Sequence, residues 1–185
     1  MRALFTRLAR FFGRSVRRRS RSGPDLRVAE DPRFNAVPRT IELRSPAFAS
    51  GGTVPTGGSP PLEWSGVPPE AKTLVLVVED VDVPFPRPLT HAVAYDIAPT
   101  TTSLPPDALD GRHGGVTMGY NGGGGRQYIA PAPLTGQRPH RYVFTLLAVD
   151  IVPRFEQPPT RVRLLDAVAG HVRALGELIG TAEPS

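Results

Sequence analysis

The segment "KTLVLVVED", residues 72–80, is the feature that most constrains the fold of this chain. Its apolar part, residues 73–78, has the length of a strand and falls well short of the ~18 residues that a membrane-spanning helix needs. An apolar side chain at nearly every position indicates a strand that is buried on both faces. We therefore expect residues 72–80 to lie at the centre of a sheet, with three carboxylates (Glu79, Asp80 and Asp82) at or just beyond its end.

The rest of the sequence favours short elements around this strand. The chain has 22 Pro and 19 Gly among 185 residues, and both residue types interrupt helices. It has no Cys, which excludes a disulfide framework and thiolate chemistry. The length suits one domain with a full hydrophobic core. Further strands are predicted for residues 40–45, 91–97 and 141–150.

One long helical segment is predicted near the C-terminus. It runs from Thr160, a helix cap that follows two prolines, to Gly180 as the stop. Gly170 and Gly176 cost about 1 kcal/mol each in a helix, which suggests close packing on a sheet. The fold class is therefore mostly β, two packed sheets with a C-terminal α-helix. The predicted core face of this helix consists of Leu164, Leu165, Val168, Val172, Leu175, Leu178 and Ile179.

Residues 1–22 differ in composition from everything that follows. They contain eight arginines and no acid, and subtracting these from the net charge of +5 leaves −3 for residues 23–185. On a helical wheel the apolar side chains gather opposite the arginines, as in a helix that lies on an anionic membrane surface. A helix packed on the domain, a disordered basic arm, a nucleic-acid contact and a wrongly assigned start codon are the alternatives. The expected domains are 1–22, a linker at 23–38, and 39–185.

Polar residues gather where the predicted strands begin or end. Asp80 and Asp82 follow the first strand and would share a side if extended. His91 opens the second, and His140 and Tyr142 open the third. Two carboxylates, two imidazoles and a phenol at the rim of a core are suited to a small anion or zwitterion.

Each of these residues also has an ordinary interpretation. An Asp pair after a strand usually makes turns, and a lone His near a strand is usually a packed core residue. We interpret His113 and His171 as structural. A metal site made by the two aspartates and two histidines is a weaker alternative, because no tight His spacing supports it. No metal or other cofactor is predicted.

Several motifs together resemble the phosphatidylethanolamine-binding protein family, in its bacterial and archaeal branch often labelled Raf-kinase-inhibitor-like. They are "SPAF", "SPPLEWSGVP", "DVDVP", "YIAPAPLTGQRPHRYVFTLLAVD" and "GHVRALGELIG", with His91 in its place between them. The resemblance covers roughly residues 40–181. It implies an antiparallel β fold of two sheets and a pocket for phosphate, acetate or a phospholipid head group.

The resemblance also assigns the pocket residues. Asp80, Asp82, His91, His140 and Tyr142 match the family's motifs, and a loop near Ala130 and Pro131 would form one wall. Ala92, Ala130 and Leu134 depart from the family pattern, and Ala130 replaces a glycine whose backbone freedom would help expose an anion-binding N–H.

These observations predict a non-catalytic binding protein for a small anion or a phospholipid head group. We expect it to be cytoplasmic, with residues 1–22 able to hold it at the inner face of the membrane. The rival hypothesis is a regulator of a kinase or protease that docks a phosphorylated or acidic loop in the same pocket. A hydrolase with an Asp–His general base is a third, weaker hypothesis, because no nucleophile motif such as Gly-x-Ser-x-Gly is present. Nucleic acid is not an expected partner.

Overall fold

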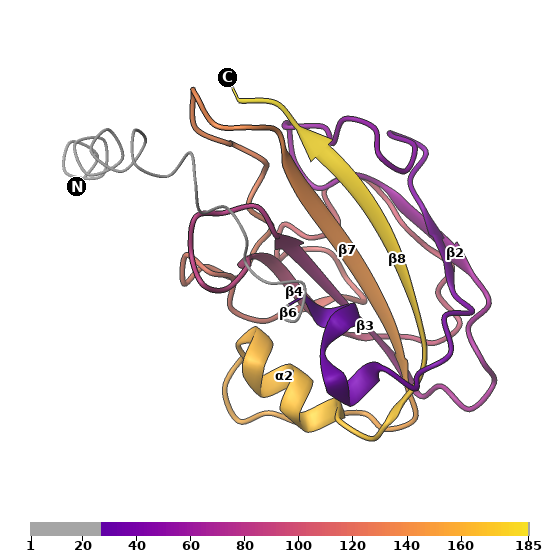
Figure 1. Ribbon diagram of the computed structural model, residues 1–185. Coiled ribbons are helices and arrows are strands. Elements are labelled where there is room, and N and C mark those ends of the chain that lie inside the picture. The colour runs from indigo at the N-terminus through magenta and orange to yellow at the C-terminus, as the bar shows by residue number, and fades with distance from the viewer. Residues whose placement is uncertain (1–26, 185) are drawn as a thin grey trace.

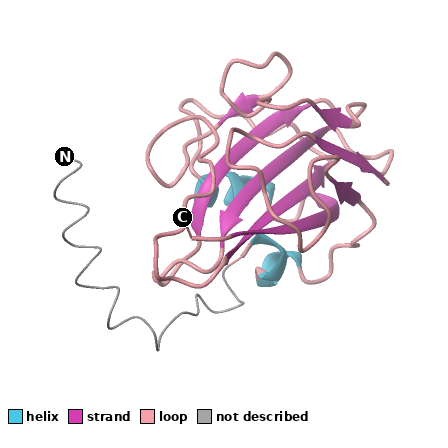
Figure 2. Ribbon diagram, turned by 90° about the horizontal axis from the view of Figure 1, so that it is seen from above, coloured by secondary structure: helices cyan, strands magenta, loops and turns pink. Residues whose placement is uncertain are grey.

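The computed structural model describes residues 27–184 as two antiparallel β-sheets flanked by short helices (Figures 1 and 2). The smaller sheet has the order β1-β2-β5, and the larger has the order β6-β4-β3-β7-β8. The small sheet comprises β1 (Glu42–Arg44), β2 (Leu62–Ser65) and β5 (Ser103–Leu104). The large sheet comprises β3 (Thr73–Asp80), β4 (Leu89–Ile97), β6 (Thr117–Met118), β7 (His140–Val149) and β8 (Val172–Ala182). These strands confirm the mostly β fold class with two antiparallel sheets.

The predicted central strand, residues 72–80, is β3, and it is buried along its whole length. It lies between β4 and β7, so both of its edges are hydrogen-bonded. Leu74, Leu76 and Val78 face the core between the two sheets. Val75 and Val77 face a second core on the other side. Because side chains alternate along a strand, an apolar run was needed to fill both cores.

The predicted C-terminal helix is present only in its first part. Helix α2 spans Arg161–Val168, starts at the Thr160 cap as expected, and buries Leu164, Leu165 and Val168. Beyond Gly170, which has a φ of 80°, the chain continues as the strand β8 and pairs with β7 over their full length. The prediction of helix from residue 169 to 180 is therefore wrong. Tertiary pairing with β7 overrides a local apolar spacing that suits both structures.

Glycines in β8 allow other segments to cross it closely. A Cβ on Gly176 would lie 2.2 Å from the Ile41 carbonyl oxygen, and one on Gly180 would lie 2.3 Å from Val54. The prediction that Gly176 marks close packing is thus explained, although the element that carries it is a strand.

Part of the predicted linker, residues 27–38, packs on the domain. Two 3₁₀ turns, η3 (Val28–Glu30) and η4 (Pro32–Phe34), bury Val28, Ala29 and Phe34 in the second core beside α2. The Val28 N–H also donates to the buried carboxylate of Glu79 at 2.9 Å. These residues are therefore part of the folded unit. The predicted amphipathic helix at residues 1–22 and the first part of the linker lie outside the described residues.

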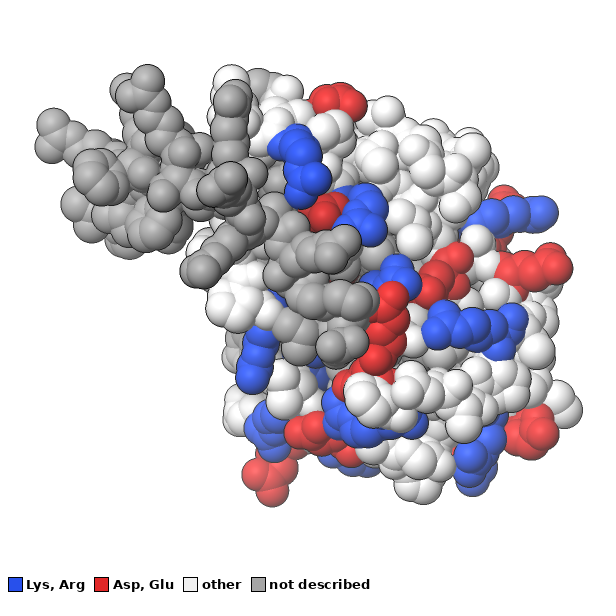
Figure 3. Space-filling model, viewed as in Figure 1, with Lys and Arg blue, Asp and Glu red and all other residues white. Residues whose placement is uncertain are grey.

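Ion pairs fasten this N-terminal segment to the sheet. Arg39 pairs with Glu177 of β8 at 3.0 Å, and Arg33 pairs with Asp31 and with Asp166 of α2. Figure 3 shows acidic and basic side chains interspersed over the described part of the face that is turned toward the viewer in Figure 1. Most of these pairs are partly exposed, so each contributes little alone. Within residues 27–184, no helix has the length and hydropathy needed to cross a membrane.

Candidate functional site

Four of the predicted site residues come together at one end of the large sheet. Asp80 is the last residue of β3 and lies opposite Tyr142 of β7 in the strand register. His140 is the first residue of β7, and His91 is the third residue of β4. Neighbouring antiparallel strands bring the end of β3 next to the start of β4 and of β7. We call Asp80, His91, His140 and Tyr142 the strand-end cluster.

The Asp80–His140 pair is the central contact of the strand-end cluster. The Nδ1–H of His140 donates to Oδ2 of Asp80 at 2.7 Å, because an ionised carboxylate can only accept. The other carboxylate oxygen of Asp80 accepts the backbone N–H of Asp82 at 3.0 Å. Both side chains are buried, with exposed fractions of 4% and 6%. Asp80 therefore fixes the tautomer of His140 and directs Nε2 away from the carboxylate.

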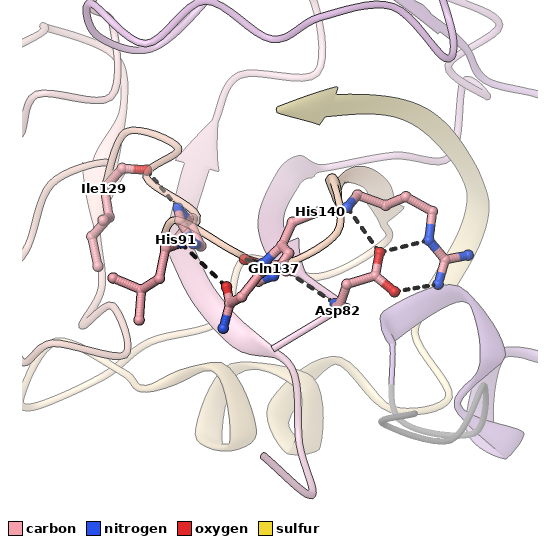
Figure 4. A network of polar contacts seen from close by, with 8 residues as sticks. Asp82, His91, Ile129, Gln137 and His140 are labelled. Carbon is pink, nitrogen blue, oxygen red and sulfur yellow. Dashed lines mark hydrogen bonds and ion pairs between the residues drawn. The ribbon is translucent and has the colours of Figure 1, made fainter. Parts of the chain in front are cut away.

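His91 is held in a different way. Its Nδ1–H donates to the Ile129 carbonyl at 2.6 Å, and the Ile129 N–H donates to the His91 carbonyl at 2.9 Å (Figure 4). The opposite ring nitrogen, Nε2, is buried and has no hydrogen-bond partner. Burial lowers the pKa of His91, although the Ile129 contact and Asp80 oppose this effect. The His91 ring is therefore neutral, and its Nε2 has no hydrogen-bond partner.

Two tyrosines complete the surroundings of His91. The Tyr142 ring meets the His91 ring edge-on, with centroids 5.1 Å apart. Burial and the Asp80 carboxylate raise the pKa of Tyr142, whose hydroxyl also meets the backbone of Ala132. Tyr128 lies 6.4 Å from His91 between ring centroids, and its hydroxyl is buried without a partner. Burial raises the pKa of Tyr128 as well, so both phenols are neutral donors at pH 7.

Sequence reasoning did not assign Tyr128 to the site. It lies in the loop before β7 and is brought to His91 by hydrogen bonds from its own backbone and from Ile129. A tyrosine at the start of the quoted segment "YIAPAPLTGQRPHRY" was the available signal, but a loop position has no fixed side.

Asp82 does not point toward the cluster. Its carboxylate accepts hydrogen bonds from the Arg141 side chain at 2.7 and 2.8 Å and from the Arg141 backbone N–H at 2.9 Å. In Figure 4 it is turned away from the His91 ring. Although burial alone would raise it, the pKa of Asp82 is lowered by these contacts. The expectation that Asp80 and Asp82 share a side does not hold, because β3 ends at Asp80 and the chain bends.

The predicted wall at Ala130 and Pro131 lies directly after Ile129. The loop's contacts with the cluster come from its backbone at Ile129 and Ala132. Ala130 and Tyr128 line a hollow of about 220 Å³, which also includes Ser59, Asp107 and Arg112. This hollow lies beside the cluster, since the Tyr128 ring contacts His91 as well.

The remaining histidines lie apart from the cluster. His113 is exposed in a loop, and His171 pairs with Asp150 beyond the other end of β7. Within residues 27–184, no three His, Cys, Asp or Glu side chains lie close enough together to hold a metal ion.

The described residues form a two-sheet β domain that buries polar side chains at one end of its large sheet. The profile of the phosphatidylethanolamine-binding protein family matches residues 44–183. The chain belongs to this family, as the motifs predicted.

This chain matches each of the following three proteins over nearly the whole of their length. The UPF0098 protein of Methanothermobacter thermautotrophicus is 37% identical over 149 residues, which cover 76% of this chain and 97% of the relative. The crystal structure of the putative phosphatidylethanolamine-binding protein homolog CT736 from Chlamydia trachomatis is 36% identical, with a TM-score of 0.72, covering 80% of this chain and 99% of that one. E. coli YbcL, described as a member of the mammalian family, is 25% identical, with a TM-score of 0.71 over 79% of this chain and 99% of its own.

Proposed function

We propose that this chain is a non-catalytic binding protein that holds a small anion or a phospholipid head group at the strand-end cluster and Tyr128. The observation that carries the proposal is the buried, unpartnered Nε2 of His91. A buried polar atom without a partner costs free energy, and a ligand that meets it recovers that cost. The Tyr128 hydroxyl, whose ring lies near that of His91, is a second buried polar group without a partner that a ligand could meet.

The chemistry of these groups favours a ligand with anionic oxygens. Protonated His91 and the Tyr128 hydroxyl are donors, and Nε2 of His140 donates as well when that ring carries a second proton, whereas the Asp80 carboxylate is already matched by His140 and Tyr142. In this proposal Asp82 acts through its backbone, by holding Asp80, and through its pair with Arg141. Ala130 and Pro131 form the adjoining wall.

The proposal carries a definite pH dependence. Burial lowers the pKa of His91 in the free protein, so anion binding at pH 7 requires proton uptake by this ring. Affinity should therefore fall as pH rises, beginning below 6.5, the ordinary histidine pKa, because the pKa of His91 in the free protein is lowered. Calorimetry in two buffers with different ionisation enthalpies measures the number of protons taken up.

Titration calorimetry with inorganic phosphate and phosphoethanolamine tests the assignment. We expect His91→Gln and His140→Asn to weaken binding at least tenfold, about 1.4 kcal/mol. His171→Gln is the matched control, because His171 pairs with Asp150 beyond the other end of β7. Isotherms that are the same for the wild type and both cluster variants would refute the proposed site.

Residues 1–22 supply the proposed membrane contact and a location at the inner face of the membrane. Their arginines and apolar side chains suit an anionic bilayer. A shortened chain for this test should begin at residue 27, because Val28 is buried and its N–H serves Glu79. We expect the full chain to co-sediment with anionic vesicles more strongly than the shortened chain, and equal binding would contradict this role.

The rival function, a protein regulator that docks a phosphorylated or acidic loop, uses the same donors. Capture of a protein from native lysate that phosphate displaces, and that is lost in His140→Asn, would favour it. Turnover of a phosphodiester or ester panel, abolished by Asp80→Asn, would favour the hydrolase hypothesis instead.

A further inference from the structure

We propose that the two loops beside the strand-end cluster form a surface that docks on an anionic lipid bilayer and inserts Phe85 and Leu134 into it. The proposal builds on the proposed function, since it supplies the source of a phospholipid head group. The loops are residues 81–88, between β3 and β4, and residues 130–139, before β7; we call them the rim loops.

Exposed apolar side chains single out the rim loops. Among the residues that the structure describes, the large exposed apolar side chains are Phe85 (61% exposed), Leu134 (55%) and Val162 (48%). Two of the three lie on the rim loops, and Val162 lies on α2. Exposing a phenylalanine to water is unfavourable, so a ligand or surface that buries it is stabilised.

Contacts at their bases place the rim loops at the same end of the sheet. The first loop begins after Asp80, and the second ends at His140, to which Asp80 is hydrogen-bonded at 2.7 Å. The Val81 N–H donates to the Arg141 carbonyl at 3.1 Å. The second loop starts after Ile129, which pairs with His91 at the start of β4. The two loops therefore border the strand-end cluster from two sides.

Proline content suits the rim loops to an apolar environment. Six of their eighteen residues are proline, and Phe85 stands between two of them, Pro84 and Pro86. Proline has no backbone N–H, so each one removes a donor that would lose its water on insertion. Proline also restricts the backbone before binding, which lowers the conformational entropy lost when Phe85 is held in the bilayer.

The charge of the rim loops favours an anionic bilayer over a soluble anion as the partner of this surface. Each rim loop carries an exposed arginine, Arg87 in the first and Arg138 in the second. The acid in these loops, Asp82, is paired with Arg141. Arginines beside apolar side chains favour an interface that has anionic phosphates above hydrocarbon. A soluble anion would use the arginines and leave Phe85 and Leu134 in water.

Single-tryptophan insertion tests the surface in the full chain. Phe85→Trp is compared with Val162→Trp, using vesicles of phosphatidylglycerol and phosphatidylcholine with brominated acyl chains. The buried native Trp64 supplies a constant background that the wild type measures. We expect the fluorescence added at position 85 to shift to the blue and to be quenched, while that added at 162 is unchanged. Equal responses at both positions would overturn the proposal, even if residues 1–22 hold the chain on the vesicle.

Removal of the apolar side chains gives the second test. Phe85→Ser with Leu134→Ser should weaken vesicle binding about tenfold or more, and Val162→Ser should not. Calorimetry with inorganic phosphate on the same double variant separates this result from the site. Unchanged phosphate binding with weakened vesicle binding supports the rim loops, whereas unchanged vesicle binding overturns them. Self-association that depends on Phe85, without any quenching by vesicles, would also overturn the bilayer as the occupant.

Discussion

Gly176→Ala distinguishes the observed strand β8 from the helix that local spacing predicts. In a helix, alanine in place of glycine stabilises by about 1 kcal/mol. In β8, the new Cβ would lie 2.2 Å from the Ile41 carbonyl oxygen and 2.9 Å from its carbon. The two structures thus predict effects of opposite sign.

The size of the loss in stability follows from the close contact between β8 and the segment at Ile41, which the new methyl group would displace. Here the Ile41 N–H donates to Leu175 at 3.3 Å, and the Leu175 N–H donates to Pro38 at 2.9 Å. Each hydrogen bond contributes about 1 kcal/mol, and overpacking costs about 1–3 kcal/mol. With one of these two bonds lost, we expect Gly176→Ala to lower the free energy of unfolding by about 2–4 kcal/mol.

Urea unfolding followed by the fluorescence of the buried Trp64 measures this change. The midpoint should fall by about 1–2 M, at a slope of about 2 kcal/mol per M, the middle of the range for such domains. Gly114→Ala is the matched control, since a Cβ there meets nothing within 4 Å. A Gly176→Ala midpoint that is equal to or above the wild-type midpoint would refute the close contact between β8 and Ile41.

Three further predictions concern ionised groups. Arg161→Met leaves the buried Glu79 carboxylate without its ion-pair partner, so unfolding at pH 7 should become easier by about 3–5 kcal/mol. Burial raises the pKa of Glu79, so this loss should shrink at pH 5; urea midpoints at both pH values check it, and equal losses would contradict it. Because the folded pKa of His91 is lowered, the unfolded state binds more protons and wild-type stability should fall as pH drops through about 6.5. Thermal unfolding from pH 8 to 5 should show this fall weakened in His91→Gln. Asp82→Asn should cost at most about 1 kcal/mol, because Arg141 is half exposed, and in acid titrations the cost should begin to shrink near pH 3.8 and vanish only at lower pH, below the lowered folded pKa of Asp82.

The sequence predicted the elements whose pattern is local and decisive. Residues 72–80 are apolar at nearly every position, and β3 is buried at every position. Helix α2 begins where its Thr160 cap and preceding prolines indicated. The segment after Gly170 was different, because its apolar spacing suits a helix or a strand. The partner that decides between them, β7, lies some thirty residues away in sequence.

The sequence predicted which of the candidate residues lie together where strand ends alone determine position. Asp80, His91, His140 and Tyr142 converge because antiparallel neighbours share an end of the sheet. Tyr128 and Asp82 lie outside regular strands, in a loop and a bend, where the alternation of side chains gives no guidance. Their positions depend on hydrogen bonds with partners distant in sequence, such as Asp82 with Arg141.

The three carboxylates at the end of β3 illustrate why charge clusters are hard to interpret from sequence. Glu79 and Asp80 are adjacent, so they face opposite sides of the sheet. Glu79 meets Arg161 and the N-terminal segment at Val28, whereas Asp80 meets His140 in the site. Asp82, beyond the strand, meets Arg141. What looks like one acidic cluster is therefore three different side-chain pairs: one fastens the N-terminal segment, one orients His140 and one holds a rim loop. Neutralising Asp80 should impair ligand binding and weaken its hydrogen bond with the Asp82 N–H, while the side-chain pairs Glu79–Arg161 and Asp82–Arg141 remain, because neither of them uses the Asp80 carboxylate.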